Sequence, residues 1–406
     1  MVFLLTIHYN ILMPLTDFCK GRFPAGLFYL DKILWTDEGV KQAAETGADF
    51  LTGVGSSELL LGLCEKYNLG VISNSNITPS WWGGKGQKAG QYADEFPLSN
   101  IDNKNDYPPS PALWGDYPVD EPNSKDFAHI NKVIKHYRER FPGKLPLINL
   151  YPNYGRHPED SSNDVILQLG NKTYEEHIDQ YIREIDLPYI CFDYYPFTKG
   201  PAPGSEVFKG YLENLDIVAR ACRKAKKDMW VIIQTGAWTP EEMLDAFQID
   251  WQVYMCLAYG AKAIFCACYS KGWWNETTSC VNLKGEKNKT YDYVKNIISA
   301  LHSPMGKNLL EYEYLCSAVY GDVNSSDERI RGQLEKQNKT ILRADLPDIE
   351  IKSDKAVMVG FFKNKSNYAA MIVNTHNPFD GSVTANVKIG NKDIRIQSGQ
   401  GVLTKF

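Results

Sequence analysis

Between residue 25 and about residue 300, short apolar runs alternate with longer amphipathic segments. The apolar runs are hydrophobic throughout rather than at every second position, which is typical of strands buried on both faces of a parallel sheet. In one of the intervening segments, Ile130, Val133, Ile134 and Tyr137 recur at helical spacing. Eight strands are predicted, at 25–30, 48–55, 69–75, 112–122, 145–154, 188–197, 229–238 and 261–270.

Helices are predicted after seven of these strands, over 37–46, 57–67, 125–140, 174–185, 208–225, 240–260 and 291–301. Eight strand–helix units in about 275 residues fit a closed barrel better than an open doubly wound sheet. A GxGxxG or P-loop motif, which would favour the open sheet, does not occur. We therefore predict an α/β chain with a (β/α)8 TIM barrel over 25–305, preceded by an N-terminal extension over 1–24.

Beyond residue 310 the hydrophobic period changes to two. The alternating runs at 356–362, 367–375, 382–389, 394–397 and 402–406 are separated by Asn, Gly, Asp and Pro. Short alternating runs with such turns indicate antiparallel β structure. The prediction for 310–406 is a small C-terminal antiparallel β-sandwich.

Charge and hydropathy exclude two classes of partner. The chain has 44 Lys and Arg against 49 Asp and Glu, a net charge of -5 at pH 7. It therefore has no general positive field for a phosphate backbone, and nucleic-acid binding is not predicted. No apolar run approaches the eighteen or so residues that a bilayer span needs, so no membrane span is predicted either.

Cysteines and sequons bear on the compartment. The nine cysteines form neither a CxxC pair nor a Cys/His cluster, so no zinc site is predicted. Seven N-x-S/T sequons exceed the roughly three or four expected by chance, which favours a secreted or periplasmic protein. The first residues lack the charged n-region of a signal peptide. We leave the compartment open, with a leader absent or truncated as one interpretation.

Polar and aromatic residues gather where the predicted strands end. Parallel barrel strands bring their carboxyl ends to one rim, where barrel enzymes have their active sites. Carboxylates, amides and aromatic rings would therefore meet there. The residues concerned are Asp116, Asp120 and Glu121 after the fourth strand, Asn149, Tyr151 and Asn153 after the fifth, Asp193, Tyr194 and Tyr195 after the sixth, Gln234 and Trp238 after the seventh, Trp273 and Trp274 after the eighth, and Trp81 and Trp82 after the third.

This mixture suits a sugar. Amides and carboxylates hydrogen-bond hydroxyl groups, and aromatic faces pack on the C–H side of a sugar ring. Cleavage of a glycosidic bond needs one carboxylic acid to protonate the leaving oxygen and a second group to attack or stabilise the sugar. Glu121 is the best candidate for the acid/base, and Asn149, Tyr151, Asn153, Tyr195, Gln234, Trp238 and Trp273 are candidate substrate-binding residues.

The stretch from 114 to about 301 resembles beta-galactosidase-like (β/α)8 glycoside hydrolases, which are related in outline to a large clan of retaining glycosidases. The resemblance rests on YPVDEPN, LPLINLYPNY, FDYYPF, YLENLDIVARACRKA and WQVYMCLAYGAKAIF, at 117–123, 145–154, 192–197, 211–225 and 251–265. In that clan the acid/base Glu ends the fourth strand, usually after Asn. The resemblance therefore implies this role for Glu121, with Asp120 in the Asn position.

One position departs from the clan. The clan's nucleophilic Glu ends the seventh strand, where this chain has Gln234, and a neutral amide cannot form a glycosyl ester. Asp193 is the first alternative, because some barrel glycosidases pair carboxylates from the fourth and sixth strands. The pair Asp120–Glu121 is the second, since it looks like that of N-acetylhexosaminidases, in which the Asp holds a 2-acetamido group that acts as nucleophile.

Two functions remain open at this stage. The first is a glycoside hydrolase acting on an oligosaccharide or glycoside with a β-linked bond. The second is a non-catalytic carbohydrate-binding barrel, which the replacement at Gln234 favours. Neither function requires a metal or an organic cofactor, and none is predicted. The sequence leaves the sugar, the anomeric outcome and the oligomeric state open.

Overall fold

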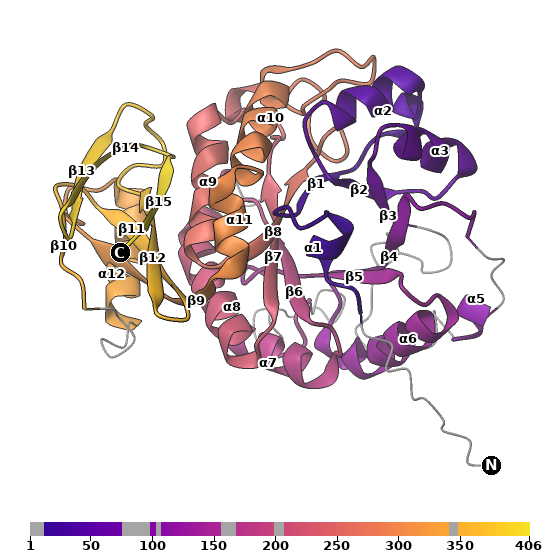
Figure 1. Cartoon of the computed structure of the whole chain (residues 1–406), viewed down its shortest axis with the longest axis horizontal. Coiled ribbons are helices and arrows are strands. Elements are labelled where there is room, and N and C mark those ends of the chain that lie inside the picture. Colours follow the sequence, from indigo (N-terminus) through magenta and orange to yellow (C-terminus); the bar gives the residue numbers. More distant parts are fainter. Residues whose placement is uncertain (1–11, 75–97, 103–106, 156–167, 199–206, 341–347) are drawn as a thin grey trace, which may run out of the picture.

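The computed structural model describes residues 12–74, 98–102, 107–155, 168–198, 207–340 and 348–406. Its central feature is a closed barrel of eight strands, each paired in parallel with its neighbours in chain order (Figure 1). All eight predicted strands are present, which confirms the barrel. They are β1 (Ala25–Phe28), β2 (Phe50–Val54), β3 (Gly70–Ser73), β4 (Leu113–Asp120), β5 (Leu145–Leu150), β6 (Tyr189–Tyr194), β7 (Asp228–Gln234) and β8 (Ala261–Ala267).

Helices surround the barrel, and those predicted from the sequence lie close to their predicted positions. The predicted helix at 240–260 divides into a 3-10 turn and α9, because Asp245 and Gln248 form a capping box that starts the α-helix at Ala246. The helices are α1 (Leu15–Phe18), α2 (Asp37–Ala44), α3 (Glu58–Lys66), α5 (Ser99–Asp102), α6 (Phe127–Arg140), α7 (Tyr174–Glu184), α8 (Tyr211–Ala225), α9 (Ala246–Ala258), α10 (Lys289–Leu301), α11 (Pro304–Glu311) and α12 (Glu328–Thr340), with 3-10 turns η1 (Lys32–Leu34), η2 (Ser124–Asp126), η5 (Val207–Gly210) and η6 (Pro240–Glu242).

Large and small side chains alternate inside the barrel. Gly26 on β1 makes room for the Phe50 ring of β2, because a Cβ at Gly26 would lie 2.4 Å from that ring. Tyr189 on β6 stacks on Trp230 of β7, with ring centroids 3.6 Å apart. The strands are almost wholly buried, as their uninterrupted apolar sequences predicted. The interior is therefore a packed core, and an accessible site can form only at its ends.

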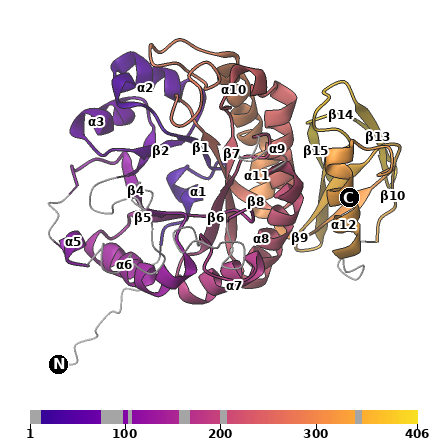
Figure 2. The same cartoon turned by 180° about the vertical axis from the view of Figure 1, so that it is seen from behind.

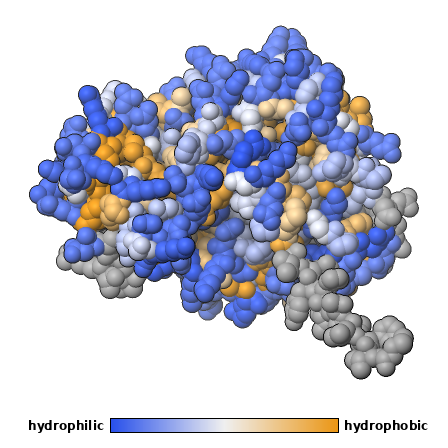
Figure 3. Space-filling view, in the orientation of Figure 1, coloured by the Kyte–Doolittle hydropathy of each residue, from blue (hydrophilic) through white to orange (hydrophobic). Residues whose placement is uncertain are grey.

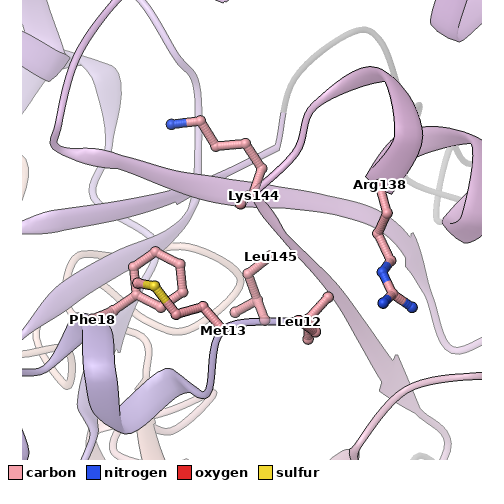
Figure 4. Close-up of a pocket in the computed structure, with 7 residues that line it drawn as sticks. Leu12, Met13, Phe18, Arg138, Lys144 and Leu145 are labelled. Carbon is pink, nitrogen blue, oxygen red and sulfur yellow. The ribbon is translucent and has the colours of Figure 1, made fainter. Parts of the chain in front are cut away.

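The amino end of the barrel is closed by the chain that precedes β1. Leu15, Cys19 and Phe23 are buried there, within the segment predicted as an N-terminal extension. Between α1 and the start of β5 lies a cavity of only about 10 Å³, lined by residues that include Phe18 and Leu145 (Figure 4). That volume is about one water molecule. This cavity is too small for a sugar ring.

The C-terminal region contains two antiparallel sheets, which confirms the predicted sandwich. One sheet has the order β15-β12-β11-β9 and the other β10-β13-β14. An apolar cluster that includes Val359, Ile372 and Val387 fills the space between them. The strands are β9 (Glu313–Tyr320), β10 (Ile351–Ser353), β11 (Val357–Asn364), β12 (Asn367–Asn374), β13 (Thr384–Ile389), β14 (Lys392–Gln397) and β15 (Gly401–Lys405).

The four-stranded sheet also packs against the barrel. Its other face contacts α9, and both views show the sheets standing beside this side of the barrel (Figures 1 and 2). Gly360 on β11 approaches the backbone so closely that a Cβ would lie 1.9 Å from the carbonyl oxygen of Ala258. Met358, Phe362 and Met371 accordingly belong to the same apolar core as the barrel.

Two helices near this region were not predicted from the sequence. α11 spans the predicted junction at 305–310, and α12 lies inside the region predicted as β structure. α12 escaped detection because its apolar stripe is narrow: Ile330 and Leu334 are fully buried, and most other positions are polar. Gln333 of α12 accepts a hydrogen bond from the backbone N–H of Leu212 and donates one to the carbonyl of Phe208. Polar contacts therefore help to hold this helix on the barrel.

Hydrophilic residues cover most of the face seen in Figure 3, with smaller apolar areas between them. Over the part of the chain that is described, no helix has the length and apolar character that crossing a bilayer requires.

Candidate active site

Three acidic residues meet at the carboxyl ends of neighbouring strands. Asp120 is the last residue of β4 and Glu121 follows it, while Asp193 is near the end of β6. β5 lies between these strands, and its Asn149 is directly opposite Asp120 in the β4–β5 register. Asp120 and Glu121 are partly exposed, whereas Asn149 and Asp193 are only 3% and 6% exposed. The barrel therefore brings together the carboxylates predicted from the sequence.

A single amide links two of the carboxyl groups. Nδ2 of Asn149 donates to Oδ1 of Asp193 at 2.8 Å and to Oδ1 of Asp120 at 3.1 Å. Since both oxygens are bonded to one nitrogen, they lie within about 6 Å of each other. The Tyr117 hydroxyl donates to the same Asp120 oxygen at 2.5 Å. Tyr117 was not among the predicted site residues, and a tyrosine inside a strand carries no signal in the sequence for this contact.

Glu121 reaches the site through an unusual backbone conformation. Adjacent strand residues normally point to opposite faces, so Asp120 and Glu121 share a site only if the strand end turns. Glu121 has φ +46°, in the left-handed region, and its N–H donates to the carbonyl oxygen of Asn149 at 2.8 Å. Burial is the main cause that raises the pKa of Tyr151, and the charges of Glu121 and Asp120 add to it. The turn therefore places both acidic side chains near the same ring.

Burial determines the protonation of the linked pair. It is the main cause that raises the pKa of Asp193 to about 7, and the negative charge of Asp120 adds to the effect. Burial also raises the pKa of Asp120. Hydrogen bonds from Asn149 to both groups, from Tyr195 to Asp193 and from Tyr117 to Asp120 act in the opposite direction. Two close carboxyl groups in a poorly hydrated place resist ionising together.

Aromatic rings follow the ends of β5, β6, β7 and β8. Tyr195 is half-buried and packs against Trp273 and Trp274, with centroids 5.9 and 5.2 Å away. Trp238 is 51% exposed and rests edge-on against Trp274. Tyr154 after β5 is also exposed, at 43%. A series of ring contacts thus runs from Tyr195, which hydrogen-bonds Asp193, to the exposed Trp238. Tyr154 is an exposed ring that the sequence prediction did not include.

The amide side chains predicted to bind substrate have partners within the protein. Nδ2 of Asn153 donates to the carbonyl of Gly210, which ties the loop after β5 to the start of α8. Gln234 is fully buried; its Nε2 donates to Gly236 and its Oε1 accepts from the backbone N–H of Phe197. Substrate binding by these two residues stays a prediction. Their observed bonds hold the loops after β5, β6 and β7 in place.

Other predicted residues have different surroundings. Asp116, to which no role was assigned, is fully buried and accepts a hydrogen bond from the Tyr107 hydroxyl. Trp81 and Trp82 lie outside the described residues. Within the described ranges, no group of three or more His, Cys, Asp or Glu side chains is arranged to hold a metal ion.

Comparisons with known proteins show which solved structures share this fold. Neither a family model nor a curated protein matches the sequence. A GH42 beta-galactosidase from G. stearothermophilus, solved as a catalytic mutant, is similar in structure with a TM-score of 0.58; the match covers 95% of this chain and 98% of that one at 8% identity. A beta-galactosidase from the psychrophilic Marinomonas ef1 matches with a TM-score of 0.49, 10% identity and coverage of 71% and 62%.

An endo-beta-1,4-mannanase from Thermotoga petrophila matches with a TM-score of 0.48 at 8% identity, covering 93% of this chain and 97% of that one. Identities this low establish the fold alone. The chain shares the fold of the GH42 beta-galactosidase over nearly its whole length, so the predicted resemblance to beta-galactosidase-like barrels is confirmed at the level of fold.

Proposed function

We propose that this protein is a glycoside hydrolase that cleaves a β-linked O-glycosidic bond. Glu121 acts as the general acid/base, and Asp193 is the second carboxylate. The observation that carries the proposal is the meeting of Asp120, Glu121 and Asp193 at the carboxyl ends of β4 and β6, beside accessible aromatic rings. The shared fold with a GH42 beta-galactosidase supports it by analogy.

The two principal carboxyl groups have surroundings that suit different roles. Glu121 is partly exposed on a turn, where it can give a proton to a leaving oxygen and later take one from water. Asp193 is buried and held by hydrogen bonds from Asn149 and Tyr195. Donors fixed on both sides orient its carboxylate toward a single position, which is what attack on a sugar carbon or activation of water requires.

Asp120 supports a variant of this mechanism. Because the left-handed turn at Glu121 lets both residues face one site, Asp120 can hold the 2-acetamido group of a substrate while that group attacks the sugar carbon. In that variant Asp193 orients Asp120 through Asn149. N-acetylated substrates separate the two mechanisms, since only the variant requires the acetamido group.

The second candidate function is a carbohydrate-binding barrel without catalysis. The environment of Gln234 favours it: both ends of this amide are bonded to backbone groups, so β7 offers no carboxylate and no free polar group at that position. Such a protein would bind oligosaccharides through the accessible rings without hydrolysing them.

The test is a panel of nitrophenyl glycosides, including N-acetylated sugars, with calorimetry on oligosaccharides alongside. We expect hydrolysis of at least one glycoside, and a loss of about two or more orders of magnitude in Glu121→Gln. Glu139→Gln is the matched control, because Glu139 is exposed in the last turn of α6. Binding without release of nitrophenol would favour the carbohydrate-binding barrel, and full activity of Glu121→Gln would remove Glu121 from the mechanism.

A further inference from the structure

Asn149 contacts all three acidic residues of the candidate site. Its side chain donates to Asp120 and to Asp193, and its backbone carbonyl accepts the N–H of Glu121. We propose that Asn149 is a positioning residue for the reaction: it holds Asp120 and Asp193 at a fixed spacing, so that the two carboxyl groups act as one unit. This inference rests on the proposed function and deepens it.

The strand order explains why this residue can do so. β5 lies between the two strands that carry the carboxylates, and Asn149 is paired with Asp120 on one side and with Cys191 on the other. Side chains two residues apart on a strand point to the same face, so Asp193 projects on the same side as Cys191. An amide at position 149 is therefore in reach of both carboxyl groups.

The hydrogen bonds of the Asn149 side chain favour a positioning role over substrate binding. A carboxamide has two N–H donors, and in Asn149 both are directed to carboxylate oxygens. Its Oδ1 is 3.8 Å from the Cys191 thiol, and the residue is 3% exposed. No N–H of this side chain is left to donate to a sugar hydroxyl. The predicted role in substrate binding would require breaking one of these bonds.

The Asn149 amide reduces the repulsion between the carboxyl groups of Asp120 and Asp193. Two carboxyl groups whose oxygens lie within about 6 Å of each other repel when both are ionised, and burial increases the cost of that repulsion. An amide that donates to both offsets part of the repulsion while keeping the oxygens at a set separation. Asn149 thereby fixes the position of Asp193, the second carboxylate of the proposed reaction, so its loss should act on the catalytic step.

The first experiment measures kinetics of Asn149→Ala with the nitrophenyl glycoside that the wild-type protein hydrolyses fastest. We expect kcat to fall by about 10- to 100-fold with little change in KM, because the carboxyl groups lose their common anchor. The matched control is Asn374→Ala. Asn374 is also fully buried and donates both amide hydrogens, to the carbonyls of Val383 and Ile396 in the C-terminal sheets, so its loss lowers stability without altering kcat.

The second variant, Asn149→Asp, has almost the same shape and carries the test if the alanine variant does not fold. When ionised, the new carboxyl group replaces a donor with a third negative charge. When protonated at lower pH, it regains an O–H that can donate. A third negative charge beside Asp193 raises the pKa of that carboxyl group, so we expect the acidic limb of the pH–kcat profile to lie at higher pH in Asn149→Asp than in the wild type. An acidic limb at the wild-type position would overturn the proposal.

The pH comparison depends on the other ionisable groups that surround the pair. Burial raises the pKa of the neighbouring tyrosines and cysteines, so they remain neutral between about pH 5 and about pH 8. Among the described residues, Glu121, which follows β4, is the further acidic neighbour. The groups are Tyr117, Tyr151, Cys191, Tyr195 and Cys268.

The outcomes distinguish this inference from the proposed function. If Glu121→Gln is inactive while Asn149→Ala keeps the wild-type kcat and pH profile, Asn149 has no positioning role and the proposed function stands. If the wild-type protein hydrolyses no glycoside, both fail together. Lower kcat in Asn149→Ala, with normal kinetics in Asn374→Ala, supports the inference.

Discussion

The two ends of the barrel treat buried carboxylates in opposite ways. At the amino end, the fully buried Asp49 accepts hydrogen bonds from Arg22 at 2.5 Å and from His302 at 3.0 Å. At the carboxyl end, Asp120 and Asp193 are held by neutral donors, two phenolic hydroxyls and one amide. At the amino end the aspartate therefore has a guanidinium partner. At the carboxyl end the donors to Asp120 and Asp193 named above are all uncharged.

The difference in hydrogen-bond partners suggests that the two ends of the barrel have different roles, one in stability and one in catalysis. Asp49, with its guanidinium partner, ties the segment before β1 to the start of β2 and to the residue that follows α10. Burial raises the pKa of Asp120 and of Asp193, in the case of Asp193 to about 7, so Asp193 can exchange a proton near neutral pH. The amino end is therefore suited to holding the barrel together and the carboxyl end to catalysis, as in barrel enzymes generally.

The largest expected effect on stability comes from the amino end. Asp49→Ala leaves the Arg22 and His302 donors and the backbone N–H of Ala25 without their acceptor. We expect the free energy of unfolding to fall by about 2–4 kcal/mol, measured by urea denaturation, while hydrolysis per folded molecule is unchanged. Asp17→Ala, at an exposed position of α1, is the control and should change stability by less than about 0.5 kcal/mol. A large loss of kcat in Asp49→Ala would contradict the division between the two ends.

The pH dependence of hydrolysis tests the carboxyl end. If Asp193 acts in its ionised form, activity should decline as the pH falls through about 7, where this group takes up a proton. The negative charge of Asp120 is one cause of the raised pKa. In Asp120→Asn that charge is gone, so the acidic limb of the pH–kcat profile should move to lower pH, whereas Glu139→Gln should leave it in place. A limb that moves upward in Asp120→Asn would show that Asp120 does not raise the pKa of Asp193.

The smallest effect concerns the backbone at Glu121. Its φ of +46° is costly for a residue with a Cβ and free of that cost for glycine. Glu121→Gly should therefore be more stable than Glu121→Ala by about 1 kcal/mol in thermal or urea unfolding, and both variants should be inactive. Equal stability of the two variants would indicate that the left-handed turn is not maintained without the glutamate.

Much of the architecture was predictable because it depends on local patterns. The sequence shows these patterns directly: uninterrupted apolar strands, helices with an apolar face, and a change of hydrophobic period after residue 310. α12 left little record, since it is held by two buried apolar residues and by glutamine contacts to distant backbone groups. Contacts between segments far apart in the chain have no periodic signature.

The candidate site was predictable in position and composition but not in its connections. Ends of parallel strands must meet at one rim, so Asp120, Glu121 and Asp193 could be placed near one another from the strand pattern alone. The bonds of Asn149 to two carboxyl groups, and the burial of Gln234 between two loops, depend on the register of the strands and on loop conformation. These features involve several segments at once.

The amino-acid sequence by itself determined that this chain forms a barrel followed by a β-sandwich, and which residues reach the carboxyl rim. It did so because strand burial and helical periodicity are properties of consecutive residues. Only the tertiary structure decided that Glu121 takes a left-handed backbone conformation, that Asn149 links Asp120 to Asp193, and that burial raises the pKa of Asp193. Those outcomes depend on side-chain direction, distance and hydration, which arise when separate strands are brought together.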